Sequence, residues 1–216
     1  MLPLTSAPAD PAPDCDLCPR LVAFRKESQL KNPDWFNGAV GSFGDPKARL
    51  LIVGLAPGLT GANRTARPFT GDFAGDLLYQ TLAEFGFSTG TYDKRADDGV
   101  ILNDCRITNA VRCVPPQNKP VGAEVNTCRP FLVDEIAAMP NLKVILALGG
   151  LAHGAVIQTL GERKSAWKFG HCATHDVPGQ PLLINSYHCS RYNTNTGRLT
   201  TEMFADVFAL IAKHLD

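Results

Sequence analysis

The sequence predicts an α/β protein, a three-layer α/β/α sandwich around a mainly parallel four-stranded sheet. Four apolar segments have the length and composition of buried strands, at residues 48–57, 99–111, 142–150 and 181–188. A turn and a segment of helical periodicity follow each of them. Alternation of strands and helices is typical of a parallel sheet with helices on both faces, because each helix returns the chain to the start of the next strand.

The helical segments are recognised by apolar residues that recur on one face. In the first, Leu77, Leu78, Leu82 and Phe85 share a face. Gly86 follows directly and predicts the end of the helix, because glycine readily adopts the left-handed conformation found there. The other helical patterns occupy residues 123–139, 150–161 and 200–215.

Length and composition predict one globular domain. Of the 216 residues, 44% are hydrophobic and 19% charged, and 21 Lys and Arg balance 21 Asp and Glu. This excludes a disordered chain and disfavours a protein that coats nucleic acid. No apolar run reaches the roughly 18 to 20 residues of a membrane-spanning helix, and the N-terminus lacks a secretory signal. We expect a disordered Pro/Ala-rich arm at residues 1–13, one domain at 14–216, and a cytoplasmic monomer.

The loop after the first strand carries candidate functional side chains. Ligands of parallel sheets bind beyond the carboxyl ends of the strands, and residues 54–72 begin there. The loop has four glycines but neither nucleotide-binding glycine motif, so a phosphate-binding loop is a weak interpretation. It also holds the ring of Phe69 and the carboxylate of Asp72, with Arg64 and Arg67 nearby. The alternative is that Asp72 only caps the next helix.

Two more strand ends carry polar side chains. Asn109 ends the second strand, and its carboxamide both donates and accepts hydrogen bonds, as recognition of a base edge or cyclic imide requires. His188 ends the fourth strand and precedes a Ser/Asn/Thr-rich loop with two arginines, a composition suited to phosphate contacts. Taken singly, Asn109 is more typical of a turn and His188 of a structural histidine. Their convergence with Phe69 and Asp72 at the strand ends favours a functional site.

Seven cysteines suggest a metal centre. Cys15 and Cys18 form a C-x-x-C pair, and Cys113 and Cys128 are the other candidate ligands. Four thiolates suit tetrahedral zinc or a [4Fe-4S] cluster, and the single C-x-x-C favours iron and sulfur, because zinc ribbons usually repeat it. The alternative is four unrelated thiols. Three further cysteines are expected to be small core residues: Cys105, Cys172 and Cys189.

Taken together, the motifs resemble a known family. They are the C-x-x-C pair, "GDPKARLLIVGLAPGLTGANRTARPFTGD", "ITNAVRCVPPQNKP" with its later cysteine, and "HCSRYNTNTGRLT". In this order they resemble the bacterial and archaeal iron-sulfur uracil-DNA glycosylases, most closely the type-b branch, family five, over nearly the whole chain after the arm. The resemblance implies an α/β/α fold and excision of uracil, and of some related deaminated or modified bases, from DNA. It also implies a [4Fe-4S] cluster on Cys15, Cys18, Cys113 and Cys128.

The resemblance assigns roles to individual side chains. Phe69 stacks on a flipped base, Asp72 activates water, Asn109 binds the base edge, and His188 faces a base carbonyl. The base-binding residues are expected to be Gly54, Ala56, Pro57, Gly58 and Phe69. Contacts to DNA are expected from Arg64, Arg67, Lys119, Ser190, Arg191, Asn193, Arg198 and Leu199. Of these, Leu199 is expected to be the wedge that fills the gap left in the base stack by the flipped nucleotide. The sequence departs from the family pattern at Leu59, Thr60 and Cys189.

These assignments predict a monofunctional glycosylase. A flipped base can be released by water, and the three pocket loops offer no obvious amine for a Schiff base. One alternative is a nucleotide or phosphoester hydrolase that uses the glycine-rich loop and requires Mg²⁺. Another is a protein that binds damaged DNA without catalysis.

Overall fold

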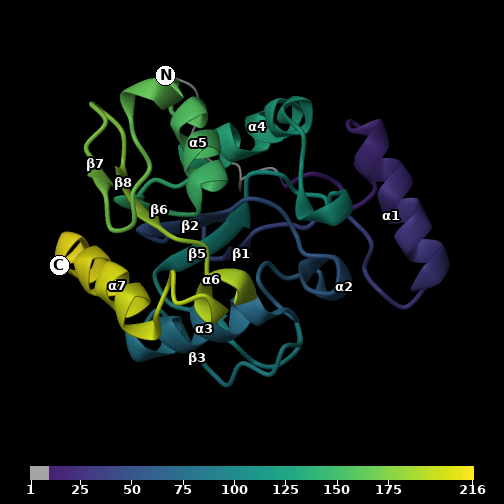
Figure 1. The fold of residues 1–216 in the computed structure, drawn as a ribbon, viewed down its shortest axis with the longest axis horizontal. Helices are drawn as coiled ribbons and strands as arrows, with labels where there is room; N and C mark the ends of the chain where they lie inside the picture. Colours follow the sequence, from purple (N-terminus) through teal and green to yellow (C-terminus); the bar gives the residue numbers. More distant parts are fainter. Residues whose placement is uncertain (1–9) are drawn as a thin grey trace.

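The computed structural model describes residues 10–216, whose centre is a six-stranded sheet in the order β1-β5-β2-β6-β8-β7 (Figure 1). The four inner strands are parallel and coincide with the four predicted segments: β2 (Leu50–Gly54), β5 (Cys105–Asn109), β6 (Val144–Leu148) and β8 (Leu182–Ser186). The prediction of four strands is wrong in number, because an antiparallel strand is added at each edge. These strands have two residues each, too few to show a pattern: β1 (Phe43–Gly44) and β7 (Thr174–His175).

The predicted second strand is two strands. Residues 101–102 form β4 (Ile101–Leu102), which pairs with β3 (Ser88–Thr89) in a separate two-stranded sheet. Asp104 has a φ of 51°, so the chain turns sharply before β5 begins at Cys105. The single strand expected over 99–111 is therefore wrong in its first half, since apolar content does not reveal a turn at an aspartate.

Helices cover both faces of the sheet, which confirms the three-layer sandwich (Figure 1). In β2, Leu50 and Ile52 pack in one apolar core and Leu51 and Val53 in the other, as expected when successive side chains point to opposite faces. The first core is shared with α3 (Phe73–Glu84) and α7 (Thr201–Leu215). The second is shared with α4 (Gly122–Ala137) and α5 (Gly150–Thr159).

Helix α1 (Pro19–Lys31) lies at one end of the molecule, away from α7 (Figure 1). Its buried side chains are Leu21, Arg25 and Ser28, so it has only a narrow apolar contact with the domain. Four short helical turns complete the described chain: α2 (Ala62–Thr65), η1 (Pro116–Asn118), η2 (Lys164–Ala166) and α6 (Arg191–Asn195). None of the helices between residues 10 and 216 has the length and apolar character needed to cross a membrane.

The expected disordered arm at residues 1–13 can be compared with the structure only at residues 10–13. Residues 1–9 lie outside the described residues. Asp10, however, accepts hydrogen bonds from the amide and hydroxyl of Ser42 at 3.1 and 3.2 Å and forms an ion pair with Arg112 at 3.0 Å. Residues 10–13 therefore belong to the domain, because a single carboxylate attaches them to a buried arginine.

Candidate active site

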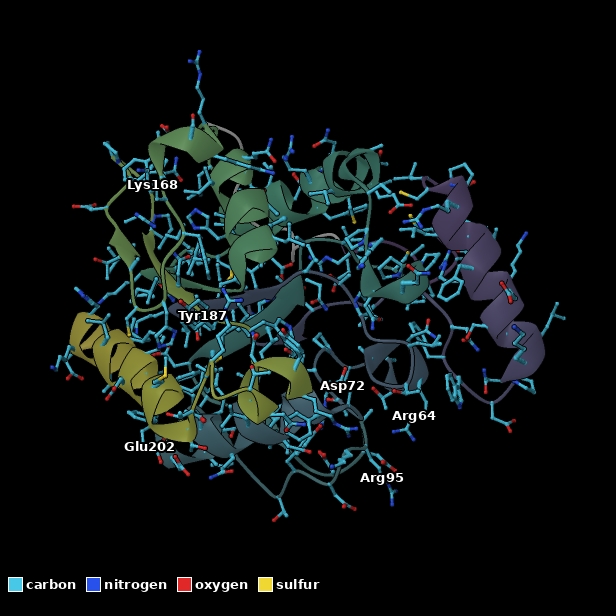
Figure 2. All side chains as sticks on the ribbon, in the orientation of Figure 1. Arg64, Asp72, Arg95, Lys168, Tyr187 and Glu202 are labelled. Carbon is cyan, nitrogen blue, oxygen red and sulfur yellow. The ribbon has the colours of Figure 1, made fainter. Side chains whose placement is uncertain are left out.

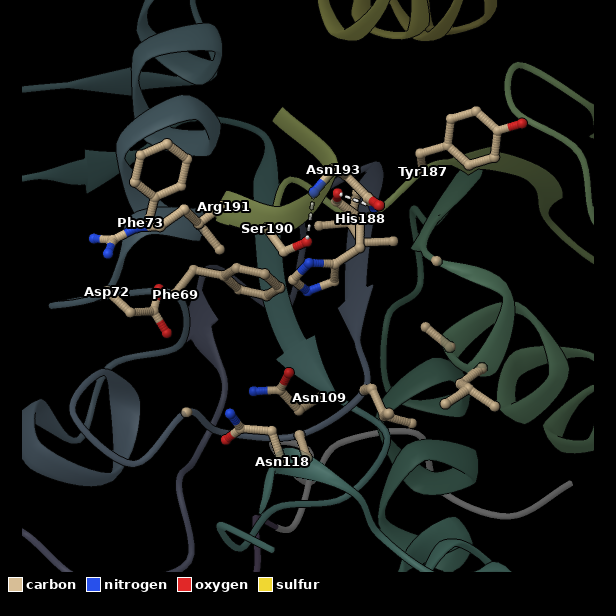
Figure 3. A pocket seen from close by; sticks show the side chains of 18 of the residues that line it. Phe69, Asp72, Phe73, Asn109, Asn118, Tyr187, His188, Ser190, Arg191 and Asn193 are labelled. Carbon is tan, nitrogen blue, oxygen red and sulfur yellow. Dashed lines mark hydrogen bonds between the residues drawn. The ribbon is translucent and has the colours of Figure 1, made fainter. Parts of the chain in front are cut away.

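The carboxyl ends of the inner strands open into one cavity of 510 Å³ (Figure 3). Its lining comes from the segments that follow β2, β5, β6 and β8, as expected for a parallel sheet. Of the residues predicted from sequence, the cavity contains Ala56, Pro57, Gly58, Phe69, Asp72, Asn109, His188, Ser190, Arg191, Asn193 and Arg198. In Figure 2, Asp72 lies well inside the outline of the molecule, whereas Arg95 lies at its margin.

Asp72 occupies the position before α3, and its carboxylate lies near the amides of Ala74 and Gly75 at the start of that helix. Its carboxylate makes no cap hydrogen bond, and its buried Oδ1 has no hydrogen-bond partner. Burial raises the pKa of this carboxyl above its ordinary range, while the amides of Gly75 and Ala74 oppose the shift. A Cβ at Gly58 would lie 2.6 Å from Asp72 Oδ2, so this loop needs glycine to admit the carboxylate. Because Asp72 also lines the cavity, a role limited to capping the helix is disfavoured.

Phe69 is held in a strained backbone conformation. Its φ of 52° is unusual for a bulky residue, and such outliers concentrate at functional sites. The hydroxyl of Tyr92 donates to the carbonyl of Phe69 and accepts from the amide of Gly71, both at 3.2 Å. A Cβ at Gly54 would meet the Phe69 ring at 2.6 Å. Gly54 therefore leaves the space that the Phe69 ring occupies, although it does not itself line the cavity.

Asn109 is the last residue of β5 and pairs in register with Gly54. It is not a turn former, since it continues the parallel ladder. Only 3% of the residue is exposed, and no hydrogen bond fixes its carboxamide within residues 10–216. Both its donor and its acceptor are therefore available to a ligand in the cavity.

His188 follows β8 and faces Phe69, with ring centroids 6.0 Å apart (Figure 3). Burial lowers the pKa of His188 to about 4, so the imidazole is neutral near pH 7. Asn193 Nδ2 donates to the backbone carbonyl of His188 at 2.8 Å and so ties α6 to the end of the strand. A neutral imidazole here donates one hydrogen bond without carrying a charge.

The rim of the cavity carries exposed cations on and after α6. The hydroxyl of Ser190 caps α6 by accepting from the amide of Asn193 at 3.5 Å. The guanidinium of Arg191 lies 5.2 Å from the ring centroid of Phe73, and that of Arg198 lies 4.7 Å from Tyr187. Aromatic contacts hold the arginines in place while leaving them open to phosphate.

Two residues expected to contact DNA have structural roles instead. Arg67 is buried and forms an ion pair with Asp98 at 2.7 Å. Its guanidinium also lies over the rings of Phe43, Tyr79 and Tyr92. Its positive charge is thus already compensated within the protein.

Leu199 is 1% exposed and packs in the core shared with α3 and α7. It therefore does not present an apolar wedge to DNA. Arg64 and Lys119 lie outside the cavity: Arg64 is half-buried and donates to the carbonyl of Thr60 at 2.9 Å, while Lys119 is exposed.

Comparison with known proteins gives the family. Residues 42–212 match the family model described as the uracil DNA glycosylase superfamily. The chain belongs to this superfamily. It is 46% identical over 198 residues to the type-5 uracil-DNA glycosylase of Thermus thermophilus, covering 89% of this chain and 90% of the relative. It is 39% identical over 198 residues to the type-5 enzyme of Pyrobaculum aerophilum, covering 90% and 86%. It is 34% identical over 179 residues to the type-4 enzyme of that organism, covering 81% and 77%.

Sequence reasoning missed several residues of this superfamily member's cavity. Asn118, with a φ of 56°, approaches the site from the loop that follows β5 (Figure 3). Phe169 and Tyr187 line the side near α5. Tyr192 does not line the cavity, but it is 72% exposed on α6 and follows Arg191, which does. No periodic pattern marks these residues, because all four lie outside regular strands and long helices.

The four candidate metal ligands meet at a second cavity, beside α1. Cys15, Cys18, Cys113 and Cys128 all line it, among apolar neighbours such as Leu21. Burial raises the pKa of Cys113 to about 12, and the nearby thiols add to this effect. Within residues 10–216, no three or more His, Cys, Asp or Glu side chains are grouped closely enough around one point for a single metal ion.

The other cysteines are consistent with small core residues. Cys105 and Cys189 are buried without exposed surface, whereas Cys172 is half-buried. Burial raises the pKa of Cys189 to about 12, and the charge of Asp72 acts in the same direction. The thiol beside the catalytic cavity is therefore neutral at physiological pH.

Proposed function

We propose that this chain hydrolyses the N-glycosidic bond of uracil in DNA and releases the free base. One observation carries the proposal: a single cavity joins a buried carboxylate, an aromatic ring, an unpaired carboxamide and a neutral imidazole. The names of the type-5 and type-4 relatives describe the same activity.

Base recognition rests on Phe69 and Asn109. The ring of Phe69 offers a flat face on which a planar base can stack. The Asn109 carboxamide can accept from the imide N–H of uracil and donate to the adjacent carbonyl. Cytosine presents the opposite donor pattern at this edge, so the same amide discriminates against it. Related deaminated bases with a similar N–H and carbonyl edge are further expected substrates, since the 510 Å³ cavity is larger than a pyrimidine needs.

Bond cleavage creates a sugar with cationic character and an anionic base. The Asp72 carboxylate, which lines the cavity, stabilises the cation and holds the water that adds hydroxide to the sugar carbon. The neutral His188 donates a hydrogen bond to the base oxygen where negative charge develops. The bonding electrons leave with the base, which then takes up a proton.

Access to the bond requires that the nucleotide leave the duplex, at a cost of about a few kcal/mol. Arg191 and Arg198 on the rim are suited to hold the phosphates on either side. We assign the wedge that fills the vacated stack to Tyr192, which is exposed beside them, in place of the buried Leu199. All these groups come from one chain, so we propose that a monomer is the active unit on uracil-containing DNA. We also propose that it acts in the cytoplasm.

The four cysteines of the second cavity would hold a [4Fe-4S] cluster. Such a cluster binds each thiolate to a different iron, so it needs cysteines around a cavity rather than around a point. Bound there, it supplies a structural cross-link between the N-terminal segment and the loop from Cys113 to Asn118. Iron and acid-labile sulfide in the purified protein, with brown colour, test this assignment against zinc.

Free-base release from an oligonucleotide with one uracil tests the proposed activity. We expect uracil release in the presence of EDTA, an intact abasic strand, and no covalent complex after borohydride treatment. A requirement for Mg²⁺ would favour the phosphoester hydrolase. Tight binding without release would favour a non-catalytic DNA-binding protein.

A further inference from the structure

Buried arginines in this chain are paired with carboxylates, with one exception. Arg67, Arg106 and Arg112 are each at most 6% exposed, and they form ion pairs with Asp98, Glu135 and Glu135 respectively. Arg25 is equally buried, at 5%, but has no carboxylate partner within residues 10–216. Residues 1–9 contain no Asp or Glu in sequence. Arg25 is therefore a buried cation without a carboxylate counter-ion in the described residues.

The guanidinium of Arg25 lies against the segment that carries the first cysteines. It donates to the carbonyls of Pro13 and Cys15, both at 2.5 Å. Its Nε is buried and has no hydrogen-bond partner. Arg25 lies one turn after Leu21 on the buried face of α1, and Leu21 lines the cysteine cavity. Burial raises the pKa of Cys18, with the charge of Glu124 adding to the shift, and it raises the pKa of Cys113; the charge of Arg25 opposes the shift in both.

A buried cation without a counter-ion is strongly unfavourable, so an anion is expected beside Arg25. The carboxylate of Glu124 acts on Cys18 but is already paired with Arg20 at 2.7 Å, so within residues 10–216 the thiols are the groups left to balance Arg25. A [4Fe-4S] centre with four thiolates carries a net negative charge that meets this requirement. Arg112 flanks the same cavity and donates its backbone N–H to Cys128 Sγ at 3.3 Å, but its guanidinium is already paired with Glu135 and Asp10.

We propose that Arg25 is the counter-ion of the metal centre and that its unpartnered Nε–H would donate a hydrogen bond to it. The proposal rests on the proposed cluster and extends it to a residue that is not a ligand. Hydrogen bonds and charges around the sulfurs set the stability and reduction potential of such clusters. Arg25 thus has two functions: it fixes the Cys15 segment and neutralises the centre.

The test compares Arg25→Gln with Lys26→Gln, which removes the same charge from the adjacent exposed position of α1. After challenge with an iron chelator, Arg25→Gln should lose its iron and its absorption near 400 nm about 10- to 100-fold faster than the unmodified protein. Its reduction potential should become more negative, because the reduced, more negative cluster loses a stabilising cation. Lys26→Gln should match the unmodified protein in both.

Arg25→Lys keeps the charge without the Nε donor and covers the case in which the glutamine variant does not fold. It should restore most of the potential but only part of the resistance to the chelator. Equal iron loss and equal potential in unmodified protein and folded Arg25 variants would overturn the proposal. An unmodified protein that lacks iron and sulfide would instead overturn the cluster assignment, and absence of base release would overturn the proposed activity. Each failure is thus recognised separately.

Discussion

The catalytic cavity and the ion-pair network behind β5 treat buried polar groups in opposite ways. In the network, Glu135 accepts hydrogen bonds from Arg106, Arg112, Ser42 and Thr108. Two arginines and two hydroxyl groups thus stabilise its charge. In the cavity, Asp72 Oδ1 has no partner, and neither the Asn109 amide nor the His188 ring is hydrogen-bonded within residues 10–216. Buried polar groups are normally satisfied, so the Asn109 amide and the His188 ring, which line the cavity, mark where a substrate completes the bonding.

The largest effect on uracil release is expected at Asp72. Asp72→Asn removes the charge that stabilises the sugar cation and should lower uracil release about 1000-fold. The free energy of unfolding should stay the same or rise, because a desolvated charge is removed. Rates of base release and urea unfolding measure the two effects.

Asp76→Asn on the same helix is the matched control, since Asp76 pairs with Lys94 at the surface. It should keep full activity. Unchanged turnover in Asp72→Asn would remove Asp72 from the mechanism.

In the ion-pair network around Glu135, a substitution should lower the free energy of unfolding. Glu135→Ala leaves Arg106 and Arg112 buried without their shared counter-ion and should lower the free energy of unfolding by about 3 to 5 kcal/mol. Asp134→Ala, at the neighbouring exposed position, should change it little. Denaturant unfolding of both variants checks this, and equal stabilities would show that the network carries no net energy.

Within the cavity, Asp72 and His188 should affect the pH dependence of base release differently. Asp72 acts ionised and its pKa is raised, so activity is present above that pKa and falls about tenfold per pH unit below it. His188, with its pKa lowered to about 4, stays neutral between pH 6 and 8 and adds no change there. Single-turnover rates from pH 4 to 8 measure the profile. A step near pH 6.5 that disappears in His188→Ala would contradict a neutral His188.

The smallest expected effect is at the rim. Tyr192→Ala should reduce uracil release from duplex DNA about tenfold, since a wedge offsets part of the unstacking energy. Release from single-stranded DNA, which needs no wedge, should be unchanged. Leu30→Ala, at an exposed apolar residue of α1, is the control. An equal loss on both substrates would mean that Tyr192 acts in binding rather than in flipping.

The sequence was sufficient for the parallel core of the fold and for the centre of the site. Buried parallel strands are continuous apolar runs, and their carboxyl ends show where Asp72, Asn109 and His188 meet. The edge strands have two residues and carry no pattern. The turn at Asp104, which splits the second predicted strand, depends on a local φ that composition does not encode.

Burial within loops was the main source of error. Arg67 and Leu199 stand in polar loop sequences, where an arginine is expected to meet solvent and a leucine to be available to a partner. Arg67 is buried because Asp98, 31 residues later, neutralises it. Leu199 is buried because the chain after α6 returns to the core shared with α7. Both facts depend on long-range contacts that a single sequence does not show.

The strained Phe69 has a kinetic consequence for the search along DNA. Tyr92 already holds the Phe69 backbone, and Gly54 leaves space for the ring, before any base arrives, so the protein has little left to rearrange. The energy of this strain is supplied once, during folding, rather than at each encounter. We therefore expect the waiting time at a lesion to depend on how often the DNA opens, with weakly paired bases sampled first.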